Sequence, residues 1–192
     1  MNQFKLPLAM VAATMVLFVA ALGVNELLFT SLDFAPGISW IYLPAGVRLL
    51  CTLLFGGSGA IGLLLVSWLV CFFHFFPNDP VRSLAGGILA SAAPYLVYLF
   101  ARRWFGLRSS LVNLSPQRLL VCALAFSLAS PLLHHLWFAL YEHKDHLGYS
   151  FLVMASGDLG GTLVVLYAVR YVLLRFVPRV PPPASAGSGT PA

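Results

Sequence analysis

Six ionisable side chains lie inside or at the edges of long apolar stretches: Glu26, Arg48, His74, His134, His135 and Asp158. An ionised group in a hydrocarbon environment is costly unless it is paired, so each of the six is a candidate for an ion pair or for a ligand contact. The opposite charges of Arg48 and Asp158 make them the strongest candidates. No nucleophile elbow, P-loop or zinc-protease motif accompanies them, so we expect no enzymatic activity.

Metal binding is the second chemistry that these residue types allow. Cys71 and His74 have the spacing that places two ligands on one helix face, and His143 and His146 repeat it. Neither pair forms a complete metal-binding pattern, even with His134 and His135 added, so we expect no metal and no cofactor. The three cysteines (Cys51, Cys71 and Cys122) all lie in apolar stretches. Their odd number argues against a disulfide framework.

The composition identifies the environment in which these groups act. Of 192 residues, 60% are hydrophobic and 9% are charged, and the mean hydropathy is +0.90. A soluble domain is about one quarter charged, whereas this chain has only 17 acidic and basic residues. We therefore expect an all-α integral membrane protein in a lipid bilayer. The composition excludes a soluble enzyme and a nucleic-acid-binding domain.

Apolar runs separated by Pro, Gly and charge predict a bundle of about six transmembrane helices. The predicted spans are residues 6–32, 38–55, 60–76, 81–101, 117–141 and 149–174. Ser115 and Pro116 are typical of a helix cap followed by the first helical residue, and Pro131 predicts a kink. Residues 1–177 form the predicted membrane domain. The tail 178–192, rich in Pro, Ser, Gly and Ala, is predicted to be disordered.

The basic residues predict the orientation of this bundle. Six spans place both termini on one side, and the basic residues gather there: Lys5, Arg102, Arg103, Arg108, Arg118, Arg175 and Arg179. Only Arg82 and Lys144 fall on the other side. Because Lys and Arg mark the cytoplasmic face, both termini are predicted to be cytoplasmic.

Arg48 and Asp158 are predicted to lie at a similar depth. Arg48 is about ten residues into the second span and Asp158 about nine into the sixth, and both helices run inward. An Arg48–Asp158 ion pair follows, either as a link between helices or as part of a ligand site. Glu26, His74, His134 and His135 fall in the same outer half of the bilayer, which indicates a polar pocket or polar core. Each histidine alone is also consistent with an interfacial or internally bonded side chain.

Two motifs resemble the first kind of MASE-type bacterial membrane-associated sensor domains. They are Trp40-Ile-Tyr-Leu-Pro-Ala-Gly-Val-Arg48 and Gly157-Asp-Leu-Gly-Gly161. The resemblance implies an input module of a bacterial inner membrane, of a family usually fused to cyclic-dinucleotide enzymes or histidine kinases. The chain departs from the family in having about six spans, in having Arg48 at a commonly apolar position, and in lacking an output domain after the last helix.

The sequence therefore leads to two functional hypotheses. The first is a sensory or regulatory subunit that binds a small ligand or a partner protein and signals through a separate membrane or cytoplasmic protein. The second is the substrate-binding subunit of a vitamin or small-molecule uptake transporter, since such proteins also have about six spans and an outward-facing site. The alanine-rich first span would then pack on the transporter partner. A membrane enzyme is the weakest alternative.

Overall fold

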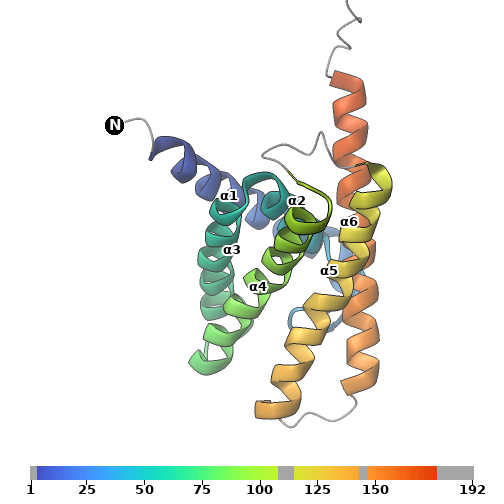
Figure 1. The fold of residues 1–192 in the computed structure, drawn as a ribbon. Helices are drawn as coiled ribbons and strands as arrows, with labels where there is room; N and C mark the ends of the chain where they lie inside the picture. Colours follow the sequence, from blue (N-terminus) through green and yellow to red (C-terminus); the bar gives the residue numbers. More distant parts are fainter. Residues whose placement is uncertain (1–3, 108–114, 143–146, 177–192) are drawn as a thin grey trace, which may run out of the picture.

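The computed structural model describes residues 4–107, 115–142 and 147–176, and in this part of the chain six α-helices make up almost all of the fold (Figure 1). The elements in chain order are α1 (Lys5–Phe29), η1 (Thr30–Leu32), β1 (Asp33–Ala35), β2 (Ile38–Ser39), α2 (Leu43–Phe55), α3 (Gly57–Val70), η2 (Cys71–Phe75), α4 (Pro80–Trp104), α5 (Pro116–Trp137), η4 (Phe138–Glu142) and α6 (Leu147–Phe176). The predicted disordered tail and the pair His143 and His146 lie outside the described residues.

Five of these helical segments are long and apolar enough to cross a membrane: Lys5–Leu32, Gly57–Phe75, Pro80–Trp104, Pro116–Glu142 and Leu147–Leu173. They match five of the six predicted spans closely. The predicted cap at the start of the fifth span is confirmed, because Ser115 Oγ accepts a hydrogen bond from Arg118 N at 3.3 Å. The all-α, multi-pass character predicted from composition is therefore present in the structure.

The second predicted span, residues 38–55, is wrong as a continuous helix. Residues 33–35 and 38–39 form a small antiparallel hairpin around Pro36 and Gly37, and α2 begins only at Leu43. With 13 residues, α2 is about 20 Å long, shorter than a hydrocarbon core of about 30 Å. Gly37 has a φ of +77°, and Pro44 follows just inside the helix. These residues fix the turn and the late helix start.

Helix α2 lies at the centre of the bundle. Ten of its 13 residues are buried, and it contacts all five other α-helices. Around it the other helices form an open row in the order α1, α3, α4, α5, α6, and α2 links the two ends by packing on both α1 and α6. The side chains of the short helix are therefore directed towards the interior of the protein.

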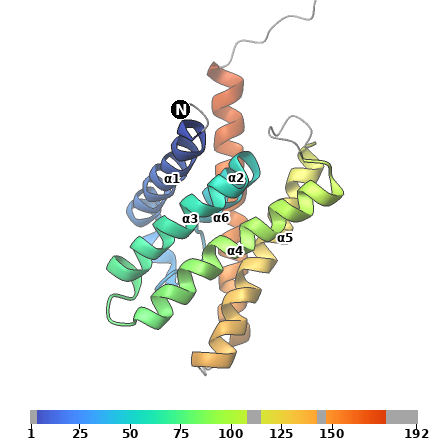
Figure 2. The same ribbon diagram turned by 60° about the vertical axis from the view of Figure 1, so that its left-hand side comes forward.

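The six helices alternate in direction, so that the start of α1 and the end of α6 lie at the same end of the bundle (Figures 1 and 2). The hairpin, η2 and η4 lie towards the opposite end. We call this opposite end the hairpin end. The arrangement agrees with termini on one side of a membrane.

A non-helical stretch, residues 39–42, runs directly across α6. Tyr42 N donates a hydrogen bond to Gly157 O at 3.1 Å. A Cβ atom on Gly157 would lie 1.9 Å from Ser39 O, and one on Gly161 would lie 1.9 Å from Tyr42 O. Both glycines are therefore required by backbone contact. The two motifs that resemble the sensor-domain family are thus packed against each other.

We predict that Gly157→Ala lowers the free energy of unfolding by about 1–3 kcal/mol, because the added methyl group overlaps the Ser39 carbonyl and must push the chains apart. Gly160→Ala is the matched control, since a Cβ atom there meets nothing within 4 Å and alanine favours the helix. Thermal unfolding of both variants in detergent provides the comparison. Equal melting temperatures for the two would contradict the contact.

Candidate functional site

A cavity lies between the helices near the hairpin end. Its wall takes residues from α1, the hairpin turn, α2, α3, η2, α4, α5, η4 and α6. Measured as room for the centres of water-sized molecules, it has a volume of about 50 Å³. One water needs about 10–15 Å³ on this measure, so the space holds about four waters or a small ligand of similar bulk.

Arg48 of α2 lines this cavity and is 7% exposed. Its guanidinium lies over two aromatic rings, with its Cζ 5.4 Å from the Phe18 ring centroid and 5.2 Å from that of Tyr42. Arg48 Nη2 donates to Tyr42 Oη at 3.4 Å. Its Nε is buried and has no hydrogen-bond partner within the described part of the chain. The arginine is thus enclosed by aromatic surface and keeps an unused donor.

The start of α2, and with it the position of Arg48, is held by a side chain from α1. Asn25 is buried, and its Oδ1 accepts a hydrogen bond from Leu43 N at 2.8 Å. This contact serves as a helix cap supplied from another helix, because the first amide groups of a helix have no partner within it. Asn25 therefore has a positioning role that its sequence context did not indicate.

Asp158 lies near Arg48 but outside the cavity wall. It is 1% exposed, and Ser130 of α5 lies beside its carboxyl group. Arg48 acts on Asp158 electrostatically, yet no nitrogen–oxygen distance within 4.0 Å joins them. Asp158 Oδ2 has no hydrogen-bond partner among the described residues. The structure thus brings the two charges into one region without the direct ion pair expected from the sequence.

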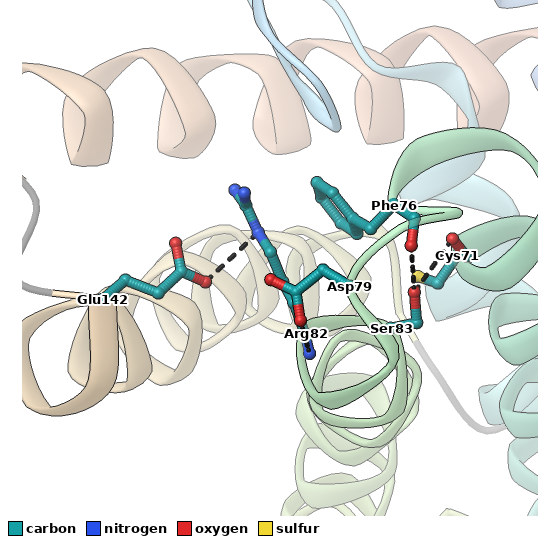
Figure 3. Close-up of polar contacts among 6 residues, drawn as sticks. All are labelled: Cys71, Phe76, Asp79, Arg82, Ser83 and Glu142. Carbon is teal, nitrogen blue, oxygen red and sulfur yellow. Dashed lines mark hydrogen bonds and ion pairs between the residues drawn. The ribbon is translucent and has the colours of Figure 1, made fainter.

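Arg82 is a second cation on the cavity wall, and the sequence analysis assigned it only a role in topology. Its Nε lies 3.2 Å from Glu142 Oε1 at the end of η4. Its guanidinium also lies over the Phe76 ring, with Cζ 4.1 Å from the centroid. Figure 3 shows the Arg82 side chain between Glu142 and Phe76. The sequence did indicate that Arg82 is unusual, because a basic residue in the first turn of a helix opposes the helix dipole.

The segment that carries Arg82 and Phe76 is fixed by side-chain hydrogen bonds. Asp79 Oδ1 accepts from Arg82 N at 3.0 Å and caps α4. Ser83 Oγ donates to Phe76 O at 2.9 Å and to Cys71 O at 3.1 Å (Figure 3). These bonds join the π-helical turn η2 to the start of α4, so Arg82 and its aromatic neighbour move as one unit.

The two adjacent histidines of α5 have different surroundings. His134 lines the cavity, and its Nδ1 lies 2.8 Å from Ser130 O. His135 is directed towards α6, where its Nε2 lies 3.1 Å from Ser150 Oγ. Its ring also contacts Phe138 and Phe151 edge to face. His134 thus faces the central space, whereas His135 packs between α5 and α6.

Glu26 and His74 are separated from this site. They contact each other at the hairpin end, with 3.5 Å between Glu26 Oε1 and His74 Nε2. Their side chains are 39% and 55% exposed, and neither lines the cavity. The six candidate residues therefore divide between the cavity, the adjoining α5–α6 contact and this outer pair.

Two more polar groups on the cavity wall were not identified from the sequence. Ser67 Oγ of α3 and Trp137 Nε1 of α5 are buried atoms without a hydrogen-bond partner among the described residues. Within those same residues no group of three His, Cys, Asp or Glu side chains is placed to hold a metal ion. The geometry therefore provides hydrogen-bond donors in an aromatic enclosure.

Comparison of the chain with protein-family models, with curated proteins and with solved structures finds no match. The resemblance of the two motifs to sensor domains stays a prediction.

We predict that Arg48→Gln combined with Asp158→Asn costs less stability than the sum of the single changes. The two charges interact through space, and we expect a coupling free energy of about 1–3 kcal/mol for buried charges at the effective dielectric constant of a protein interior. Unfolding of the four proteins in detergent measures it. Arg48→Gln with Asp33→Asn is the control pair, since Asp33 is an exposed residue of the hairpin. Strict additivity in both pairs would show that Arg48 and Asp158 act independently.

Proposed function

We propose that this protein is a membrane-embedded sensory or regulatory subunit that binds a small ligand in its central cavity and signals through a separate protein. One observation carries the proposal: residues that line a cavity near the hairpin end contain buried polar atoms that have no hydrogen-bond partner among the described residues. Arg48, Ser67 and Trp137 all contribute such atoms. A purely structural core would be expected to satisfy them.

The energetic argument favours a binding role. A buried polar atom without a partner costs about 1–3 kcal/mol, and such atoms are uncommon in native interiors. Within a membrane bundle, polar groups facing the interior usually mark a ligand or ion pathway. The cost is recovered when a ligand supplies the missing partners, so the cavity is better explained as a binding site than as packing.

The charge distribution supports a bacterial inner membrane with the hairpin end facing outwards. Lys5, Arg102, Arg103, Arg118 and Arg175 lie at the end of the bundle that holds the two termini. Basic residues favour the cytoplasmic face. At the hairpin end Arg82 is paired with Glu142. In this orientation the cavity lies in the outer half of the bilayer, where a sensor of external compounds would bind its ligand.

The uptake-transporter subunit is the second candidate, and the exposure of α1 favours it. Only 17% of the apolar window of this span is buried, compared with 33–44% for the other four spans. Its outward surface includes the small residues Ala12, Ala20 and Gly23. Small residues allow helices to approach closely in lipid, so α1 is suited to contact a transporter partner.

We predict that the protein purifies from its membrane with a small molecule, and that Ala90→Leu lowers the occupancy several-fold because the larger side chain fills the cavity. Ala90 is buried on the cavity wall. Ala92→Leu is the matched control two residues along the same helix, at a position outside the cavity wall. Native mass spectrometry in mild detergent measures the bound mass. Equal occupancy in both variants would place the ligand elsewhere.

Co-purified proteins distinguish the two candidate functions. Crosslinking followed by mild solubilisation should recover a kinase or a cyclic-dinucleotide enzyme if the protein is a signalling subunit. Recovery of a transporter ATPase, together with a bound vitamin, would contradict the sensor and support the uptake subunit.

A further inference from the structure

The polar groups of the cavity wall are unbalanced in favour of hydrogen-bond donors. The unpartnered atoms Arg48 Nε, Ser67 Oγ and Trp137 Nε1 can all donate. Among the described residues on the wall there is no Asp or Glu, while Arg48 and Arg82 contribute two positive charges. A ligand that completes this site must therefore bring acceptor atoms and negative charge.

Both guanidinium groups lie over aromatic rings, and this position leaves the N–H donors at their edges available to an anion. Arg48 lies over Phe18 and Tyr42, and Arg82 lies over Phe76 and, more distantly, Phe138 at 5.9 Å. Rings cover the faces of a guanidinium, whereas its N–H donors point outwards in its plane. Carboxylates bind along that edge through two parallel hydrogen bonds. Stacking therefore preorganises the arginines for an oxyanion.

Arg82 already holds a carboxylate, and this contact shows what the site recognises. Glu142 Oε1 lies 3.2 Å from Arg82 Nε (Figure 3), an ion pair without the geometry of a hydrogen bond. Glu142 comes from η4, outside the cavity wall. An anion within the cavity would compete with Glu142 for the same arginine.

We propose that the ligand of the cavity is a small organic carboxylate with an apolar body, held by Arg48 and drawing Arg82 away from Glu142. This assignment rests on the proposed function and adds the chemical class of the ligand. Donors from Ser67 and Trp137 complete the oxyanion contacts. The apolar body lies against Phe18, Phe76 and Phe138, which line the same space. The volume of about four waters limits the ligand to about four non-hydrogen atoms, roughly the size of acetate, since a cavity that takes benzene is about 150 Å³.

The test uses radiolabelled acetate and its neutral analogue acetamide, with the full-length protein in mild detergent and equilibrium dialysis as the measurement. We expect acetate to bind and acetamide to bind at least about tenfold more weakly, since a buried charge pair contributes more than a neutral contact. Arg48→Gln should weaken acetate binding about thirtyfold or more. Arg103→Gln, at an exposed position near the end of α4, should leave it unchanged.

Variants of the second arginine keep the test decisive if Arg48→Gln does not fold. Arg82→Gln should weaken acetate binding, whereas Glu142→Gln should tighten it, because this change removes the competing carboxylate. Size-exclusion chromatography confirms the folding of each variant. A merely structural Arg82–Glu142 pair would give no tightening in Glu142→Gln, and that result would overturn the proposed exchange.

The outcomes separate the ligand class from the general function. If acetamide binds as tightly as acetate and Ala90→Leu abolishes both, the cavity binds ligands but the carboxylate assignment is wrong. If neither probe binds at millimolar concentration, the assignment is also wrong, and the molecule recovered by native mass spectrometry decides the function independently. Binding of acetate that is insensitive to both arginine variants would overturn the site itself.

Discussion

The hydrogen bond from Tyr42 N to Gly157 O, at 3.1 Å, joins an unwound stretch of chain to a helix inside the bundle. Non-helical backbone is tolerated at membrane depth only where protein groups satisfy it. Here Gly157 and Gly161 let residues 39–42 lie directly on α6, while Asn25 supplies an acceptor to the start of α2. The late helix start, the position of Arg48 and the cavity beside it all depend on this backbone contact.

The same contact explains why Asp158 is buried without lining the cavity. Its neighbours Gly157 and Gly161 face the 39–42 stretch, and successive helix positions are rotated by about 100°. The carboxyl group is therefore turned towards Ser130 of α5 rather than towards the space that Arg48 faces. Arg48 and Asp158 influence each other through the protein interior, and neither Asp158 nor any other Asp or Glu of the described residues lines the cavity wall itself.

Much of this fold was predictable from the sequence, because hydropathy and Pro or Gly punctuation define five of the helices and their ends. The second span was predicted too long. Residues 38–42 are as apolar as a membrane-spanning helix, and it is their backbone contact with α6 that shows them to be non-helical. The shared depth expected for Arg48 and Asp158 stays a prediction, and its residue count changes because α2 begins at Leu43 rather than at residue 38. Helix rotation was not predictable from the sequence; Arg82, Ser67 and Trp137 line the cavity, whereas Glu26 and His74 lie outside its wall.

Arg82 has an unfavourable position for a basic residue, and this constrains what the site does. It occupies the first turn of α4, where the helix dipole disfavours a cation, and it shares a small cavity with Arg48. Glu142 and Phe76 offset part of that cost. Two like charges around one space repel each other more strongly as water is excluded. An anion between the two arginines would attract both of them and would accept hydrogen bonds from their unused donors. The charges and donors of this site are therefore balanced only when such a ligand is bound.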